Sequence, residues 1–315
     1  MRLLVASRSG VEHTRFDRLG DYLAPGDLLV VNTSATLAAA IDGMRADGRP
    51  VTVHFATALD DGTWVVEIRP RTNATGPVAD TYGGDVIDLP DGVRLHVDSA
   101  HPTGQTRLWR SRIGVEGPIA AYLARHGRPI RYGYVPRVYP LAQYQTVFAQ
   151  EPGSAEMPSA GRPFTAKLVV RLITRGVLIA PITLHTGVSS QDPGEPPQPE
   201  RLRVPAATAR LVNLTHASGS RVVAVGTTVT RALESAANPG GTVRERTGWT
   251  DLVLGPDHPA RVVDALITGW HAPGASHLEL LRAVAGTRLV QHAYDAAVAA
   301  GYLWHEFGDS CLLLP

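Results

Sequence analysis

The sequence contains a single cysteine, Cys311, among its 315 residues. One thiol excludes an internal disulfide and a cysteine-rich zinc site, and it fits the reducing conditions of the cytoplasm. No apolar run approaches the ~20 residues that a membrane helix needs, and the first apolar run is too short for a signal peptide. We therefore expect a cytoplasmic protein without a membrane partner. The chain opens directly in a strand-like segment at residues 3–6, which suggests that an amino-terminal piece is missing.

Net charge is almost absent as well, because 30 Lys and Arg residues oppose 29 Asp and Glu residues and leave a formal charge of +1. This balance does not indicate a nucleic-acid partner, although a local basic patch can hide in such a total. The sequence also lacks a Walker phosphate loop, a dinucleotide-binding fingerprint and a Ser-His-Asp nucleophile elbow. Its histidines show no metal-ligand spacing, so we expect no metal.

The patterns that are present predict two domains, since 315 residues are long for a single core. Apolar runs such as residues 28–31 and 177–182 predict buried strands, and helix-like segments lie between them. In the middle of the first half, apolar and polar residues alternate, which is typical of an antiparallel barrel or sandwich. The expected fold class is α/β, with a discontinuous α/β domain at 1–45 and 116–315 and an inserted antiparallel β-barrel domain at 46–115.

Polar loops follow the predicted strands, and they carry candidate site residues. Gly226-Thr227-Thr228 lies between a strand and a helix, where free N–H groups and two hydroxyls suit a carboxylate, a phosphate or a ribose. A threonine at that place can equally serve only as a helix cap. His185 ends another apolar strand and can exchange a proton near neutral pH. The alternative is a structural histidine that is bonded to the backbone.

Further candidates surround the apolar strand predicted at residues 262–267. Asp264 lies in that run, where an acid must be paired or functional. His271 follows in a loop with Trp270, whose ring could stack on a purine. The alternative is a core tryptophan with an aspartate that ties loops together.

Other stretches are interpreted from their composition. Residues 154–164 form a polar loop with Glu156, which either wraps a ligand with backbone N–H groups or is an ordinary surface loop. Residues 189–205 are the most proline-rich part of the chain, so we expect a mobile loop, a lid or a plain linker there. Ser276 and Glu279 have the spacing of a capping box, which predicts a helix start.

Seven segments, spread between residues 21 and 309, carry a resemblance to a known family. The most specific read AVGTTVTRALE at 224–234 and DALITGWHAP at 264–273. The others are DYLAPGDLLVVNT at 21–33, YQTVFA at 144–149, PSAGRPFT at 158–165, TLHTG at 183–187 and Gly-Asp at 308–309. Together they resemble the S-adenosylmethionine:tRNA ribosyltransferase-isomerase family of queuosine biosynthesis.

The resemblance implies an enzyme that transfers the ribosyl part of S-adenosylmethionine to the aminomethyl group of a 7-deazaguanine base in tRNA. Adenine and methionine leave, and the ribose becomes an epoxycyclopentanediol. A base must remove a proton beside the sulfonium, and a donor must assist adenine departure. We expect His185, His271 and Asp264 at this chemistry. The residues expected to bind substrate are Tyr144, Gln145, Ser159, Gly161, Phe164, Thr165, Gly187, Gly226, Thr227, Thr228, Arg231 and Trp270.

The chain departs from the family pattern mainly at its ligand loops. Pro163 stands where the family has a histidine, and Glu156 stands where the family has a small residue. The family's Met-His-x-Glu stretch is replaced by the proline-rich segment. These departures predict a divergent paralogue, and together with the low net charge they make tRNA a disfavoured partner.

Two other classes of function stay open on the sequence. The first is a non-catalytic protein that kept a nucleoside pocket and lost the chemistry, which the change at Pro163 favours. The second is an RNA-binding β module that uses Arg107, Arg110 and Arg112. An S-adenosylmethionine-dependent enzyme with an acceptor other than tRNA is a further alternative.

Overall fold

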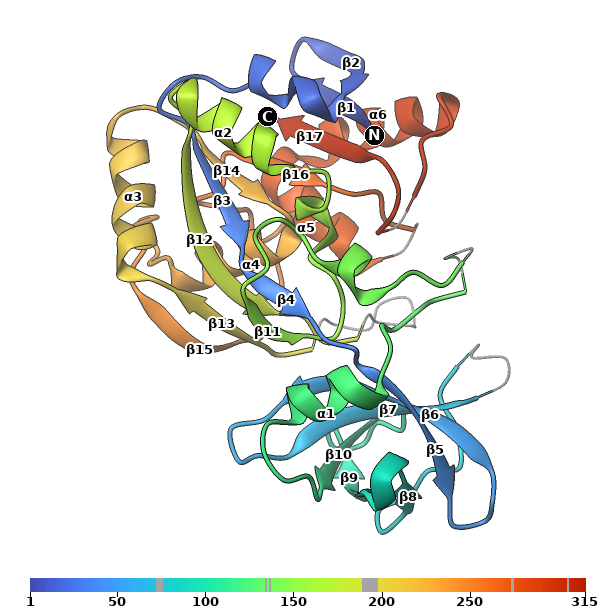
Figure 1. Ribbon diagram of the computed structural model, residues 1–315. Helices are drawn as coiled ribbons and strands as arrows, with labels where there is room; N and C mark the ends of the chain where they lie inside the picture. Colours follow the sequence, from blue (N-terminus) through green and yellow to red (C-terminus); the bar gives the residue numbers. More distant parts are fainter. Residues whose placement is uncertain (72–75, 134, 136, 189–197, 273–274, 305) are drawn as a thin grey trace.

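The structure is a computed structural model of the chain, and it describes residues 1–71, 76–133, 135, 137–188, 198–272, 275–304 and 306–315. In this part of the chain, nine strands form one mixed sheet and six strands form a closed barrel. Figure 1 shows the sheet with its helices as the upper body and the barrel as the lower one. The predicted α/β fold with an inserted antiparallel barrel is therefore confirmed.

The large sheet combines strands from both ends of the chain. Its strands are β1 (Arg2–Ser7), β2 (Gly10–Arg15), β3 (Leu28–Asn32), β12 (Leu178–His185), β13 (Glu200–Val204), β14 (Val222–Val225), β15 (Arg246–Thr250), β16 (Ala265–Thr268) and β17 (Ser310–Leu314). They lie in the order β15-β13-β12-β3-β14-β16-β17-β1-β2. The neighbours from β12 through β3 and β14 to β16 are parallel, so their carboxyl ends share one edge of the sheet.

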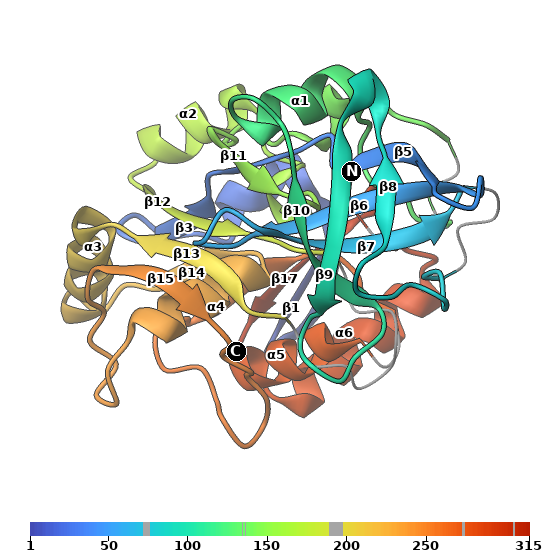
Figure 2. The same cartoon turned by 90° about the horizontal axis from the view of Figure 1, so that it is seen from below.

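Helices cover both faces of this sheet because its central strands are apolar on both sides. Leu28 and Val30 face one core, whereas Leu29 and Val31 face the other, as the alternation of side chains along a strand requires. Figure 2 shows α2 on one side of the sheet and α4, α5 and α6 on the other. The helical segments are η1 (Phe16–Asp21), α2 (Ala166–Thr174), α3 (Ala206–Ala217), α4 (Thr227–Ala236), α5 (Ser276–Ala285) and α6 (Thr287–Ala299).

The barrel has its own core. Val53 and Phe55 of one strand belong to this core together with Val66 and Leu95 of two other barrel strands, as the alternating pattern predicts. The barrel strands are β5 (Ala40–Arg45), β6 (Pro50–Ala58), β7 (Trp64–Pro70), β8 (Val86–Asp88), β9 (Arg94–Ala100) and β10 (Leu108–Ile113). They begin at Ala40, ahead of the predicted limit at residue 46, and the domain limits themselves stay a prediction.

Short elements connect the two bodies. The strand β4 (Ser34–Thr36) follows β3 and pairs in parallel with β11 (Glu151–Ser154). The helix α1 (Ile119–His126) packs on the barrel, and η2 (Pro90–Gly92), η3 (Leu141–Tyr144) and η4 (Ser159–Gly161) are single turns. Residues far apart in sequence, 34 and 154, thereby meet beside the end of β12.

Two local predictions were wrong. Residues 200–204, expected to be irregular, form β13 because they pair with both β12 and β15. Residues 189–197 of the same predicted loop lie outside the described part. The capping box is absent, since the side chain of Ser276 makes no cap and Glu279 pairs with Arg282 instead.

Candidate functional site

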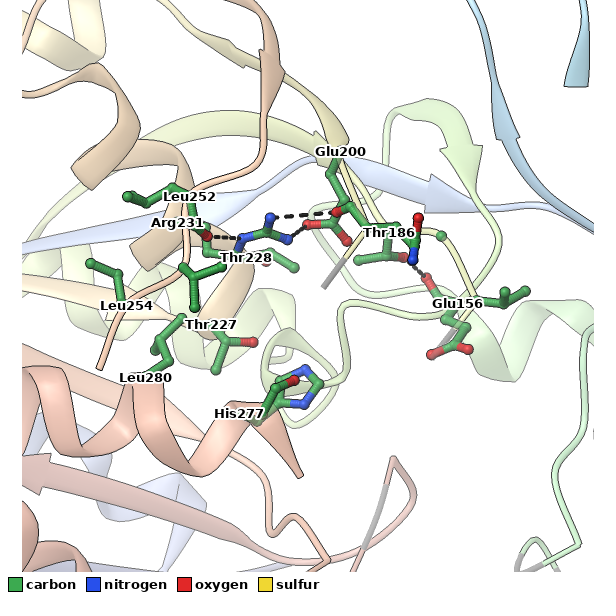
Figure 3. A pocket seen from close by; sticks show the side chains of 15 residues that line it. Glu156, Thr186, Glu200, Thr227, Thr228, Arg231, Leu252, Leu254, His277 and Leu280 are labelled. Atoms are coloured by element: carbon green, nitrogen blue, oxygen red, sulfur yellow. Dashed lines mark hydrogen bonds and ion pairs between the residues drawn. The ribbon is translucent and has the colours of Figure 1, made fainter. Parts of the chain in front are cut away.

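A hollow lies at the shared carboxyl edge of the parallel strands, where α/β proteins usually bind ligands. About 770 Å³ of space between its walls is not filled by protein atoms, a figure that includes open solvent at its mouth. Figure 3 shows Glu156 on one side of the hollow and Thr227 on the other. The residues that line it are Glu156, Thr186, Gly187, Val188, Gln198, Glu200, Thr227, Thr228, Arg231, Leu252, Val253, Leu254, Ser276, His277 and Leu280.

The start of α4 forms one wall. Gly226 precedes the helix with a φ of 100°, a backbone conformation that favours glycine, and Thr227 is the first helical residue. The Asn32 side chain donates to Thr228 Oγ1 at 3.2 Å and to the Leu184 carbonyl at 2.8 Å. It thereby fixes the start of α4 against the end of β12. Free N–H groups and hydroxyls at this helix start suit a carboxylate or ribose oxygens.

Arg231 and Glu200 form a nearly buried ion pair in the adjoining wall. The guanidinium of Arg231 donates to the Glu200 carboxylate and also to the carbonyls of Leu252, at 3.1 Å, and Thr250, at 3.4 Å. Burial raises the pKa of Glu200, and the neighbouring Arg231 charge opposes that rise. Arg231 was expected to hold a substrate carboxylate or phosphate, but in this structure its charge is compensated by Glu200.

His185 ends β12 next to Thr186 of the hollow. Its Nδ1 lies 2.7 Å from Ser34 Oγ, which lies 2.6 Å from Ser154 Oγ. Ser154 Oγ accepts from the backbone N–H of Thr186 at 3.0 Å. Burial lowers the pKa of His185, which keeps its imidazole neutral at pH 7. A neutral imidazole held by the Ser34 hydroxyl, which Ser154 holds in turn, is suited to accept a proton.

The imidazole of His185 lies directly over Gly153, and this contact leads to a testable prediction. A Cβ added at Gly153 would lie 2.5 Å from the ring, too close to be tolerated. We expect Gly153→Ala to displace the ring and to reduce turnover by about 10²-fold, because small misplacements of a reacting group are costly. Gly114→Ala is the matched control, since nothing lies within 4 Å of its added Cβ. Unchanged steady-state kinetics of Gly153→Ala would show that the position of the ring is unimportant.

His271 lies beside the hollow rather than in its lining. Its ring stacks on that of His277 with centroids 4.4 Å apart and an interplanar angle of 1°. Its Nε2 lies 3.2 Å from Thr268 Oγ1, at the end of β16. The stack therefore brings His271 to the hollow through His277, a lining residue.

His277, half-buried in the wall of the hollow, gives a pH-dependent prediction. Burial, and then the charge of Arg231, lower the pKa of His277 to about 4. The unfolded chain therefore binds more protons between the ordinary histidine pKa of about 6.5 and pH 4, so stability is present above pH 6.5 and falls as pH drops through this window. The free energy of unfolding therefore decreases on acidification from pH 6.5 to 4. We expect His277→Gln to make this decrease smaller by up to about 3 kcal/mol.

Urea unfolding at several pH values checks this expectation. The exposed His292 offers the same substitution away from the hollow, and His292→Gln controls for the loss of one imidazole. If His277→Gln keeps the same decline in stability between pH 6.5 and 4 as the parent protein, the neutral state assigned to the imidazole of His277 is incorrect.

Comparison with known proteins decides the family. The model of the family described as queuosine biosynthesis protein matches residues 1–313. The chain belongs to this family. The S-adenosylmethionine:tRNA ribosyltransferase-isomerase of Moorella thermoacetica is 36% identical over 324 residues, which cover 99% of this chain and 92% of that protein. The protein of the same name from Thermus thermophilus is 35% identical with the same coverage.

A solved structure agrees with the family assignment. The crystal structure of S-adenosylmethionine tRNA ribosyltransferase from Thermotoga maritima is 28% identical in sequence and has a TM-score of 0.53. The match covers 99% of this chain and 92% of that one. The resemblance found from the seven sequence segments is therefore confirmed for the queuosine biosynthesis family.

In this family member, Asp264 lies away from the hollow, contrary to expectation. It stands before β16, at the amino end of the parallel strands. Its carboxylate accepts from the Val222 N–H at 2.7 Å and lies 3.1 Å from His216 Nε2. Asp264 thus ties β14 to its surroundings at the edge opposite Thr227. Asp264 therefore serves as a hydrogen-bond acceptor for the backbone, in agreement with the alternative of an aspartate that ties loops together.

Other predicted binding residues have structural roles. Trp270 and Phe164 are core residues with 1% and 4% of their surface exposed. Thr165 caps α2, because its hydroxyl accepts from the Leu168 N–H at 3.2 Å. Gly226, directly before α4, is also outside the lining of the hollow. The remaining expected binding residues outside it are Tyr144, Gln145, Ser159 and Gly161, which lie between β10 and α2.

The barrel arginines do not form a free basic surface. Arg107 pairs with the buried Glu67 at 3.1 Å, and Arg110 pairs with Asp61. Arg112 pairs with Asp98 at 2.7 Å. Since each of these guanidinium groups faces a carboxylate, the hypothesis of an RNA-binding module built on them is not supported.

Several residues of the hollow escaped the sequence analysis. Glu200 lay in a segment expected to be irregular, and His277 was considered only within a capping box. Gly153 and Ser34 reach His185 across more than thirty intervening residues, so no local pattern predicts these contacts. In the part of the chain that the structure describes, no cluster of possible metal ligands is found and no helix is long and apolar enough to cross a membrane.

Proposed function

We propose that this chain transfers and isomerises the ribosyl moiety of S-adenosylmethionine onto a 7-deazaguanine base carried by tRNA, with release of adenine and methionine. The observation that carries the proposal is family membership over residues 1–313 together with a hollow at the carboxyl edge of the sheet. Curated relatives with the corresponding name cover this chain almost entirely. The tRNA acceptor enters the proposal from those names.

Each wall of the hollow has a role in this proposal. The hydroxyls of Thr227 and Thr228 and the start of α4 bind the methionine carboxylate or the ribose hydroxyls. His185, neutral and adjacent to the hollow, removes the proton from the carbon beside the sulfonium. His271, stacked on His277, is positioned to assist the departing adenine. The apolar side chains of Leu252, Leu254 and Leu280 exclude water from the intermediates.

Turnover tests the proposal. The protein is incubated with S-adenosylmethionine and tRNA carrying the aminomethyl-deazaguanine base, and adenine and methionine are quantified together with the modified nucleoside. We expect one adenine and one methionine for each modified base. The proposal would be rejected if no adenine and no methionine were formed in the presence of tRNA and calorimetry detected no binding of S-adenosylmethionine.

A non-catalytic nucleoside-binding protein is the second candidate, and Pro163 in place of the family histidine favours it. Under this alternative S-adenosylmethionine binds, but adenine and methionine are not released with any acceptor. The substitutions His185→Ala and His271→Ala would then change affinity only. Turnover that either substitution abolishes would exclude this candidate.

A further inference from the structure

A cationic and aromatic stack lies outside the hollow. Tyr139 and Phe307 are stacked, with ring centroids 4.4 Å apart and an interplanar angle of 20°. Tyr144 packs edge-on against Phe307 at 5.1 Å. The guanidinium of Arg137 lies 4.8 Å from the Tyr139 centroid, and that of Arg162 lies 5.4 Å from the Phe307 centroid. Arg137 is exposed, so the Arg137–Tyr139–Phe307 stack ends in a guanidinium that is accessible to solvent.

The stack lies beside the Glu156 wall of the hollow. Phe307 follows Glu306, whose carbonyl accepts from Arg162 Nε at 2.9 Å. Burial, and then the negative charge of Glu156, raise the pKa of Glu306 to about 8. Tyr132 precedes the stack residues in the chain and donates its hydroxyl proton to Glu156. The hydrogen bond from Tyr132 therefore connects this segment to a residue that lines the hollow.

Positive charge near the stack is not neutralised by carboxylates. Arg131 and Arg137 are both exposed, and neither forms an ion pair with any residue that the structure describes. By contrast, Arg112 on the barrel is paired with Asp98 at 2.7 Å. The net charge of +1 therefore conceals two arginines near the stack that form no ion pair among the described residues. Such cations can contact phosphates, since their charge is not already used within the protein.

We propose that the Arg137–Tyr139–Phe307 stack receives an unpaired base of the RNA loop that presents the acceptor base to the hollow. The inference rests on the proposed function, which places the acceptor base in RNA. A base can enter a protein pocket only after it has left the stacked bases of the RNA. The bases that flanked it then lack a stacking partner. Unpaired RNA bases stack on aromatic rings and on guanidinium planes, while arginines contact the backbone. The stack and the adjacent Arg131 supply both kinds of group.

Binding of a fluorescently labelled RNA hairpin with a guanine in its loop tests the inference. Anisotropy titrations at two salt concentrations compare the parent protein with Tyr139→Ala, Arg137→Ala and Arg137→Lys. We expect Tyr139→Ala to weaken hairpin binding by about tenfold or more, since base–aromatic stacking has an effect of this size. Arg137→Ala is expected to weaken binding and reduce the salt slope by about 1. Arg137→Lys is expected to have the salt slope of the parent protein but a lower affinity, because lysine keeps the charge and lacks the guanidinium plane on which a base can stack.

Arg112→Ala is the matched control, since it removes an exposed arginine from the barrel and is expected to bind the hairpin like the parent protein. Equal hairpin binding by the parent, Tyr139→Ala and Arg137→Ala would overturn the inference. A blunt duplex that competes as well as the hairpin would also overturn it, because stacking requires an unpaired base. S-adenosylmethionine binding is measured in parallel by calorimetry. Its absence in the parent protein would reject the proposed function, whereas the hairpin titrations test the stack separately.

Discussion

The His185→Ala variant is expected to release adenine and methionine about 10²–10⁴-fold more slowly than the parent protein. This range is the usual contribution of a general base. The imidazole ends β12 beside the hollow and is held neutral by burial, with Nδ1 at 2.7 Å from Ser34 Oγ. S-adenosylmethionine affinity is expected to change little, because the ring is adjacent to the lining and not part of it. Single-turnover rates at saturating substrate measure the effect.

Asp264→Asn is the control for the His185 prediction. Asp264 was predicted to take part in the chemistry, but it lies at the opposite edge of the sheet and bonds to Val222 and His216. We expect Asp264→Asn to retain turnover, since the asparagine oxygen can still accept from the backbone. If His185→Ala turns over like the parent protein, or Asp264→Asn loses as much activity as His185→Ala, the assignment of the base is incorrect.

Arg231→Ala is expected to reduce the free energy of unfolding by about 3–5 kcal/mol, the usual cost of removing one partner from a buried ion pair. The side chains of Arg231 and Glu200 are only 7% and 14% exposed. The substitution leaves the Glu200 carboxylate buried without its cation and the Leu252 carbonyl without a donor. Urea unfolding at pH 7 measures the loss.

A double substitution separates the unpaired charge from lost packing. We expect Arg231→Leu combined with Glu200→Leu to be more stable than Arg231→Ala, because no charge is then left buried alone. Arg112→Ala, at the exposed pair with Asp98, is expected to leave stability almost unchanged. If Arg231→Ala unfolds at the same urea concentration as Arg112→Ala, the Arg231–Glu200 pair does not stabilise this wall.

The parts of the fold that depend on local pattern could be predicted from the sequence. Strictly apolar runs identified β3 and β12 because strands buried on both faces have no polar positions. Alternation of apolar and polar residues identified the barrel strands, because only one face of each of these strands points into the barrel core. The start of β5 at Ala40 was missed, since its apolar residues continue directly from those that follow β4 and give no change of period.

The candidate site could be predicted only in part. Gly187, Thr227 and Arg231, all expected to bind substrate, line one hollow because parallel strands bring their carboxyl ends together. Their roles stay a prediction. The position of Asp264 was predicted wrongly, because the sequence does not show whether an acid in an apolar run lies at the amino or the carboxyl end of the strand. The roles of Glu200 and Gly153 depend on contacts with Arg231 and His185 that only the folded chain creates.

A crystal structure of the protein with S-adenosylmethionine tests most directly whether the hollow at the carboxyl edge of the sheet is the place of reaction. We expect the ligand between Thr227 and Glu156, with its ribose facing His185. Ligand density elsewhere on the protein, with this hollow still empty at a saturating concentration, would contradict the account.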